Sequence, residues 1–258
     1  MSGNLKVKNL SITLNKTPIL KDVSFEVAPG SVCAFIGANG AGKTTTIKSI
    51  VGLYPYENGT ILINDVDAKT PESHVKLGYV PEKENFPKIS GRRFLNQCVE
   101  YFHLSPTDRD NMISKLLQLF GISDIVDRKL PKMSSGQKKK FLIIQALIHN
   151  PDLLIMDEPT ENMDPDARLS FYEIVAALKS QGKTLFISTH NLDEIQKYAT
   201  HVVIIKAGEI KYTGAVDKDN LFTIYEQYTD NVKVSSTDIK ADLTQPENTT
   251  VKAADIFK

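Results

Sequence analysis

Four short apolar runs set the pattern of this chain, and they cover residues 32–36, 153–156, 184–188 and 202–205. These runs lack the alternation of apolar and polar residues that marks a strand with one face in water, so they predict strands covered on both faces. Helical spacing of apolar residues lies between some of them, over 43–53 and 168–178. Strands that alternate with helices predict an α/β fold with a mostly parallel sheet.

Two regions depart from this alternation. Residues 5–26 and 59–64 read as short strands, with turn signals at Asn15, Lys16 and the Pro29-Gly30 pair. They predict a small antiparallel β subdomain beside the main sheet.

The second departure is helical. Residues 90–148 carry apolar residues at helical spacing, and Gly121 ends one of these helices. We therefore expect one unit over 1–216 with a helical insertion at about 88–148, followed by a short C-terminal extension, 217–258, that contains no recognisable motif.

Composition narrows the possible partners and compartment. The 258 residues include 31 basic and 31 acidic side chains, so no charge excess favours nucleic acid. Two cysteines, one of them Cys33 in an apolar run, suggest no disulfide framework and fit a reducing cytosol. No signal-peptide core opens the chain, and no apolar run approaches the roughly 20 residues of a membrane span. We expect a chain that does not itself cross a membrane but can attach to a protein that does.

A glycine-rich segment after the first apolar run fits the phosphate-binding pattern G-x-x-x-x-G-K-T. Its glycines let backbone amides surround phosphate oxygens, and the following helix start adds positive partial charge. Lysine in this pattern contacts the β- and γ-phosphates, and threonine holds Mg²⁺. The alternative is an ordinary strand–helix turn. The predicted loop consists of Gly37, Ala38, Asn39, Gly40, Ala41, Gly42, Lys43, Thr44 and Thr45.

Two carboxylates, Asp157 and Glu158, end the apolar run 153–156. The carboxyl end of such a strand lies beside the phosphate loop in sheets of this kind. We therefore predict that Asp157 binds Mg²⁺, and that Glu158 orients or deprotonates the attacking water. Without the loop, the pair would more often be a solvated turn.

Together these motifs resemble the ATP-binding subunit of the ABC transporter family, in the family's order, from about residue 5 to 213. The segment 133–137, Met-Ser-Ser-Gly-Gln, resembles the signature motif LSGGQ, and 159–164 resembles the D-loop, with Asp164 in its acidic position. His190 resembles the switch histidine, and Glu82 stands in the Q-loop position.

The resemblance implies a P-loop NTPase core and two copies that enclose two ATP molecules head to tail. Each copy contributes its loop to one site and its signature segment to the other. The resemblance assigns catalysis to Lys43, Glu158 and His190, and the metal to Thr44, Glu82 and Asp157. Further ATP contacts fall on Glu82, Ser134, Ser135, Gly136, Gln137 and Asp164. Some of the lysines 138–140 can form only a solvated helical face.

The chain departs from the family pattern at several positions. Leu14 stands where an aromatic residue usually stacks on adenine, and Glu82 replaces the commoner glutamine. Ser135 replaces a glycine, which is harmless in a helix and strained at a positive φ. Residues 161–163, Glu-Asn-Met, replace the small residues of the D-loop and could alter communication between the two sites.

The functional expectation is an ATP-hydrolysing subunit on the cytoplasmic side of the cell membrane, attached peripherally through a separate permease. The resemblance points to export of a drug, peptide or similar substrate. Phe86, Ile89 and Phe94 either face that permease or pack within the helical insertion. The alternatives are a soluble ABC ATPase of translation or DNA repair, which the absence of a second cassette, coiled coil or basic patch disfavours, and a non-hydrolysing module, which Glu158 and His190 disfavour.

Overall fold

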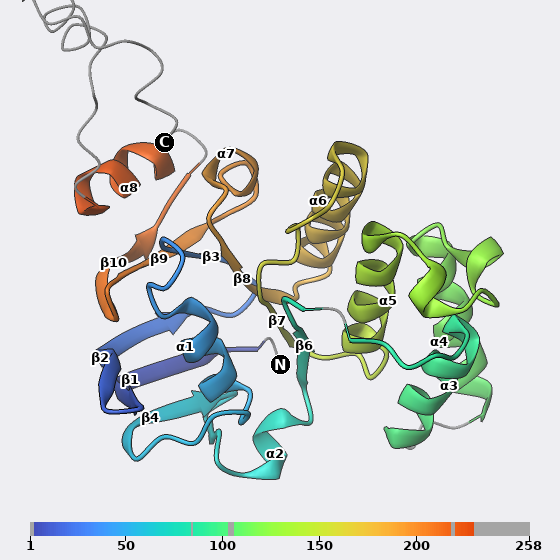
Figure 1. The fold of residues 1–258 in the computed structure, drawn as a ribbon, viewed down its shortest axis with the longest axis horizontal. Coiled ribbons are helices and arrows are strands. Elements are labelled where there is room, and N and C mark those ends of the chain that lie inside the picture. The colour runs from blue at the N-terminus through green and yellow to red at the C-terminus, as the bar shows by residue number, and fades with distance from the viewer. Residues whose placement is uncertain (1–2, 84, 103–105, 218–219, 230–258) are drawn as a thin grey trace, which may run out of the picture.

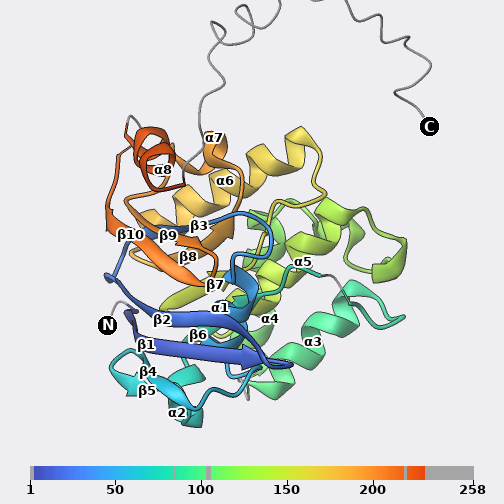
Figure 2. The same cartoon turned by 60° about the vertical axis from the view of Figure 1, so that its left-hand side comes forward.

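The computed structural model describes residues 3–83, 85–102, 106–217 and 220–229. Two β-sheets occupy one side of the molecule, and a lobe of helices lies on the other (Figure 1). Figure 2 shows the same arrangement turned by 60°, with the strands of the N-terminal sheet in front.

The larger sheet has six strands in the order β10-β9-β3-β8-β7-β6. Its strands are β3 (Val32–Ile36), β6 (Leu77–Val80), β7 (Leu153–Met156), β8 (Thr184–Thr189), β9 (His201–Lys206) and β10 (Glu209–Ala215). Neighbouring strands are parallel except that β10 runs antiparallel to β9. Every residue of β3, β7 and β8 is buried, so the predicted doubly covered parallel sheet is confirmed.

The sequence did not predict two strands of this sheet, β6 and β10. Strand β6 has four residues, too few for a clear pattern. Strand β10 alternates between half-buried and exposed positions, as an antiparallel edge strand with one face toward water does. Neither strand is a long, fully apolar run.

The smaller sheet is antiparallel, with the order β2-β1-β4-β5. Its strands are β1 (Leu5–Leu14), β2 (Thr17–Val27), β4 (Asn58–Ile63) and β5 (Val66–Asp67). The predicted turn between the first two strands lies at Asn15 and Lys16, which have φ angles of 49° and 65°. The expected antiparallel subdomain is confirmed.

Three phenylalanines join the two sheets. Phe25 comes from β2, Phe35 from β3 and Phe186 from β8, and their ring centroids lie 5.1 to 5.8 Å apart. Aromatic pairs at these separations add about 0.5–1.5 kcal/mol beyond the burial of their area. This contact fixes the small sheet against the strand that leads into the phosphate loop.

The helices are α1 (Lys43–Ile50), α2 (Pro71–His74), α3 (Gly91–Tyr101), α4 (Pro106–Leu119), α5 (Ser135–Leu147), α6 (Pro165–Ser180), α7 (Leu192–Ile195) and α8 (Leu221–Thr229), with short 3₁₀ turns at Ser123–Ile125 and Leu130–Lys132. Helices α3, α4 and α5 lie within the interval predicted to be helical and form the lobe at the right of Figure 1. Helix α1 ends at Ile50, earlier than predicted, because Gly52 turns the chain with a φ of 74°.

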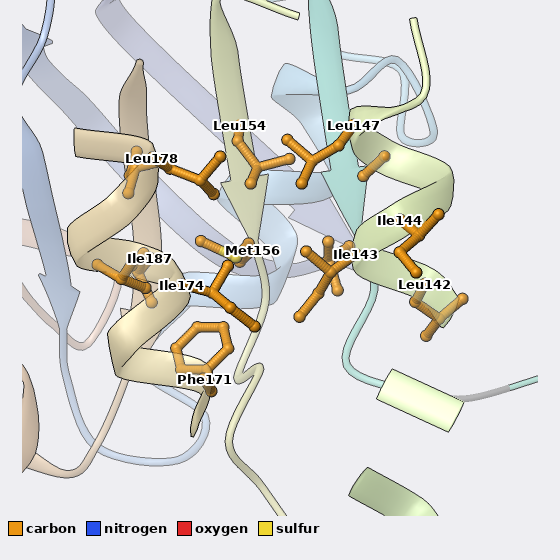
Figure 3. Close-up of a cluster of buried hydrophobic side chains, with 14 of the residues drawn as sticks. Leu142, Ile143, Ile144, Leu147, Leu154, Met156, Phe171, Ile174, Leu178 and Ile187 are labelled. Atoms are coloured by element: carbon orange, nitrogen blue, oxygen red, sulfur yellow. The ribbon is translucent and has the colours of Figure 1, made fainter. Parts of the chain in front are cut away.

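The main core lies between the large sheet and the helices α5 and α6 (Figure 3). Its labelled members are Leu142, Ile143, Ile144 and Leu147 of α5, Leu154 and Met156 of β7, Phe171, Ile174 and Leu178 of α6, and Ile187 of β8. Full burial of each such side chain stabilises the fold by about 1.5–3 kcal/mol. Helix α5, which begins in the signature segment, is thereby fixed to the strand that carries the acidic pair.

Among the described residues, no helix is long and apolar enough to cross a membrane. The predicted C-terminal extension is represented by α8, and residues 218–219 and 230–258 lie outside the described part of the chain.

Candidate nucleotide site

The predicted phosphate loop connects β3 to α1 and borders a cavity of about 410 Å³. Loop, strand ends and the segment after β8 converge on this space. The cavity is lined by Ile19, Ala38, Asn39, Gly40, Gly42, Lys43, Thr44, Thr45, Glu82, Glu158, Glu161 and His190.

The backbone of the loop requires glycine at two positions, Gly37 and Gly42. A Cβ on Gly37 would lie 2.4 Å from the carbonyl oxygen of Ile205, so any side chain would push the loop off β9. Gly42, which precedes α1, has a φ of 111°, a conformation that L-residues with a Cβ rarely adopt. These positions need glycine to bring the first amides of α1 to the cavity.

Lys43 is the buried cation of the site, with 6% of its surface exposed. Its ammonium group donates a hydrogen bond to the carbonyl oxygen of Gly37 at 2.7 Å. It also lies 3.2 Å from Oε1 of Glu158, as an ion pair without hydrogen-bond geometry. The positive charge is therefore held at the cavity wall by groups that a phosphate oxygen could replace.

Glu158 lies between Lys43 and His190. Its Oε2 is 3.0 Å from Nδ1 of His190, and its side chain is about nine-tenths buried. The backbone of Glu158 has a φ of 42°, unusual for a residue other than glycine. The predicted catalytic residues Lys43, Glu158 and His190 thus meet at one wall of the cavity.

Asp157 lies behind the cavity and is 1% exposed. Its Oδ1 accepts hydrogen bonds from Ser188 Oγ at 2.7 Å and from Thr44 Oγ1 at 3.4 Å. Burial raises the pKa of Asp157, the charges of Glu82 and Glu158 raise it further, and the two hydroxyl bonds oppose this shift.

The oxygen ligands here fit Mg²⁺. Oδ2 of Asp157 is buried and has no hydrogen-bond partner among the described residues. Thr44 donates to the other oxygen of this carboxylate, Oδ1. Thr44 and Glu82 both line the cavity. Mg²⁺ prefers a hydroxyl or one or two carboxylates together with nucleotide phosphates over a closed protein cage.

The signature segment lies away from this cavity, at the start of α5. Ser134 is the N-cap residue: its Oγ accepts from the amide of Gln137 at 3.3 Å, and Oε1 of Gln137 accepts from the amide of Ser134 at 3.2 Å. This reciprocal capping box satisfies the first free amides of the helix. Ser135 is the first helical residue and is absent from the positive-φ residues, so the serine is harmless to the backbone.

A buried lysine connects this helix to the Glu82 loop. Lys139 is 1% exposed, and its ammonium group donates to the carbonyl oxygens of Pro81 at 3.1 Å and Glu82 at 2.9 Å. The solvated face suggested for residues 138–140 is therefore wrong at Lys139. Lys140 is half-buried and donates to the carbonyl oxygen of Phe120 at 2.9 Å.

The D-loop residues behave differently from one another. Glu161 lines the cavity, and Asn162 has a φ of 59°, which asparagine tolerates better than most residues. Asp164 caps α6, and its Oδ1 accepts from the amide of Ala167 at 2.8 Å. Asp164 does not line the cavity of its own chain.

The predicted site residues therefore fall into two groups. The phosphate loop except Gly37 and Ala41 lines one cavity together with Glu82, Glu158 and His190, and Asp157 lies directly behind it. Ser134, Ser135, Gly136, Gln137 and Asp164 are not part of its lining.

Comparison with known proteins identifies the architecture. A family model described as ABC transporter matches residues 20–161, from β2 through the phosphate loop to the D-loop.

The chain belongs to the ABC transporter family.

Two bacterial relatives are named as ATP-binding proteins. A Mycoplasma pneumoniae protein named as an ABC transporter ATP-binding protein is 39% identical over 80% of this chain and 64% of its own length. The Nod factor export ATP-binding protein I of Cupriavidus metallidurans is 32% identical over 81% of this chain and 70% of its own length. The chain thus spans less than two thirds of the first relative.

Solved structures extend the likeness to almost the whole chain. An ATP-binding subunit of an ABC transporter is 30% identical, with a TM-score of 0.77, and the match covers 93% of this chain and 99% of that one. An ATP-binding cassette of an ABC transporter is 26% identical, with a TM-score of 0.76, over 86% of this chain and 96% of that one. ATP-binding domains of this family hydrolyse ATP in transporters.

The sequence did not predict two residues of the site, Ile19 and Ser188. Ile19 of β2 lines the nucleotide cavity, whereas Leu14, expected to stand at the adenine position, borders a different hollow with Tyr54 and Tyr56. Ser188 bonds to Asp157 but was assigned just to a strand. An apolar residue at a strand end and a serine within an apolar run carry no chemical signal of their own.

Proposed function

We propose that this chain binds ATP with Mg²⁺ and hydrolyses it between two copies of itself, and that the cycle drives a separate membrane permease. The observation that carries the proposal is the arrangement of Glu158, which lies within reach of Lys43 and His190 at the wall of the cavity. A buried carboxylate beside a phosphate loop is suited to accept a proton from an attacking water.

The proposed roles follow from these contacts. Phosphate oxygens compete with Glu158 for the ammonium group of Lys43, because they carry more negative charge than one carboxylate. Release from Lys43 leaves Glu158 free to orient the water, while His190 holds its Oε2. Mg²⁺ would be held by Thr44 and Asp157, with Glu82 in reach of the same cavity, and would neutralise charge on the phosphates.

The second copy supplies what the cavity of one chain lacks. Ser134 offers a hydroxyl and Gly136 a backbone amide at the N-terminus of α5, and both suit γ-phosphate oxygens. Asp164 would lie next to the partner's loop. We propose a homodimer, because each chain carries both groups of residues.

We further propose that the permease is an exporter and that the chain attaches to it peripherally, at the cytoplasmic side of the membrane. Relatives named for Nod factor export support export as the direction of transport. The proposed cassette covers residues 1–216, with the helical insertion at about 88–148 and an extension at 217–258.

One candidate surface for the permease lies at the start of the insertion. Phe86, Ile89 and Phe94 are half-buried, pack against the main core, and therefore keep part of their surface for a partner. The rings of Phe86 and Phe94 meet edge to face, with centroids 5.3 Å apart.

The decisive test of hydrolysis is Glu158→Gln. This variant keeps the shape of the side chain and removes its basicity, so turnover should fall about 10²–10⁴-fold. ATP binding should persist, and size-exclusion chromatography should show an ATP-dependent dimer. Near-wild-type hydrolysis by Glu158→Gln would remove the proposed base.

Partner and transport need a separate measurement. The tagged chain is purified from detergent-solubilised membranes of its source cells, and bound proteins are identified by mass spectrometry. Stable recovery with a polytopic membrane protein supports the transporter role. Recovery with ribosomes or DNA would favour a soluble ATPase of translation or repair instead.

A further inference from the structure

A single buried hydroxyl contacts both acidic residues of the site. Ser188 lies near the end of β8 and is fully buried. Its Oγ accepts a hydrogen bond from the amide of Glu158 at 2.8 Å and donates one to Oδ1 of Asp157 at 2.7 Å. The two partners are consecutive in sequence and are the ones proposed for metal binding and for catalysis.

The bond to the amide acts on an unusual backbone. Glu158 has a φ of 42°, a region in which a residue with a side chain is strained, so the surroundings must maintain this conformation. The hydroxyl of Ser188 is the partner of the Glu158 amide in that conformation. The conformation directs the Glu158 carboxylate to Lys43 and His190, at the cavity wall.

The bond to the carboxylate acts on its orientation. Ser188 and Thr44 both donate to Oδ1 of Asp157, which leaves Oδ2 as the oxygen with no partner among the described residues. Groups that orient a metal ligand in this way change metal affinity or activity about 10–100-fold when removed.

We propose that Ser188 is a positioning residue of this ATPase site. Its hydroxyl fixes the Asp157 carboxylate for Mg²⁺ and holds the backbone of Glu158 in the conformation that presents the base. The inference rests on the proposed function, because it assigns Ser188 a role in that same reaction. Ser188 itself does not line the cavity.

The competing explanation is a buried hydroxyl that merely satisfies its own hydrogen bonds. Thr184 provides a matched control on the same strand. It is also fully buried, its Oγ1 donates to the carbonyl oxygen of Gly3 at 2.6 Å, and it accepts from the amide of Gly30 at 2.8 Å. Both of its partners are backbone groups, and they lie at the opposite end of β8 from the acidic pair.

The test compares Ser188→Ala with Thr184→Val in the full chain. Steady-state hydrolysis gives kcat and KM, and titration with a fluorescent ATP analogue gives affinity in EDTA and in MgCl₂. For Ser188→Ala we expect kcat to fall about 10–100-fold and the gain in affinity on adding MgCl₂ to shrink, while affinity in EDTA stays within about 2-fold of wild type. Thr184→Val should lose thermal stability and keep wild-type kcat and Mg²⁺ dependence.

Two results would overturn the proposal. One is wild-type kcat and Mg²⁺ dependence in Ser188→Ala. The other is an equal loss of both in Thr184→Val, which would make the effect one of stability. If Ser188→Ala does not fold, Ser188→Cys takes its place: the weaker thiol donor should give intermediate values, and wild-type values would reject the role.

Failure of the proposed function would look different. In that case the wild-type chain would not hydrolyse ATP, or Glu158→Gln would hydrolyse it normally. A working wild type, an inactive Glu158→Gln and an unaffected Ser188→Ala would reject the role of Ser188 alone.

Discussion

The two halves of the proposed nucleotide site are built in different ways. The phosphate loop borders a cavity, and long-range contacts fix it: Gly37 against β9, and Lys43 against Glu158. The signature segment has a local capping box between Ser134 and Gln137, and its Met133 is buried in the main core. Ser134 is exposed, and the segment lines no part of the cavity.

This difference indicates where each half obtains its activity. The loop half already contains a buried cation and two buried carboxylates, so one chain should bind nucleotide by itself. The signature half presents a capped helix start. We expect it to contact only the phosphates of a nucleotide that is bound to the loop of another chain. Binding should therefore depend on the first half, and turnover on both.

Among the variants that separate the two halves, the largest effect is expected from breaking the loop half at Lys43. Lys43→Met keeps most of the length of the side chain and removes its charge, which leaves Glu158 without its buried cation. Loss of one preorganised donor to developing charge costs about 10²–10³ in kcat. Nucleotide affinity of the single chain should fall as well, and titration with a fluorescent ATP analogue measures it.

Lys140→Met is the matched control for Lys43→Met. Lys140 also donates to a backbone carbonyl, that of Phe120, but it lies outside the cavity. Its removal should change thermal stability and leave nucleotide affinity near the wild-type value. Equal losses of affinity in the two variants would contradict the special role of Lys43.

A smaller effect is expected from breaking the signature half at Ser134. Ser134→Ala removes the proposed phosphate hydroxyl and the helix cap, and loss of such a cap costs about 1 kcal/mol of stability. We expect kcat to fall about 10-fold, the equivalent of roughly 1.4 kcal/mol, with nucleotide affinity of the single chain unchanged.

Ser90→Ala controls for the lost cap. Ser90 caps α3 and accepts from the amide of Arg93 at 3.3 Å, so it shares the structural role of Ser134 away from the nucleotide site. Measured without permease, Ser90→Ala should show a similar loss of stability and normal turnover. A Ser134→Ala variant with weakened nucleotide binding in the monomer would refute the division between the two halves.

The same contrast explains what the sequence could predict. Residues 37–45 and the pair Asp157 and Glu158 form continuous motifs, and the structure brings them together at one cavity. Ser188 carries no motif, because its contact with Asp157 depends on which strands are neighbours. Once β8 is known to lie beside β7, with Met156 opposite Ile187, Ser188 falls next to Asp157. Strand order is a tertiary property that apolar runs alone do not specify.

Other misses have the same origin. Strand β10 pairs with β9 at the sheet edge, and its alternating exposure resembles that of a surface loop with scattered apolar residues. Lys139 looked like a member of a solvated charge run. Its burial follows from the packing of α5 against the Glu82 loop, which supplies two carbonyl oxygens to its ammonium group.

The smallest expected effect concerns Ser135, where the chain departs from the glycine of the signature motif. Ser135 is helical, so glycine is not needed for backbone conformation. Ser135→Gly should therefore change kcat less than about 2-fold, and it should lower the free energy of unfolding by roughly 0.5–1 kcal/mol or less, because glycine loses more freedom on folding.

Asn162→Gly serves as the comparison for Ser135→Gly, because its effect on the free energy of unfolding should have the opposite sign or be absent. Asn162 has a φ of 59°, where glycine relieves strain, so its free energy of unfolding should stay level or rise. Thermal melts and steady-state hydrolysis distinguish the two variants. A large increase in turnover for Ser135→Gly would show that the serine side chain obstructs the phosphate site of the partner chain. The signature half would then be limited by its side chains, and the capped helix start would not be sufficient to explain its function.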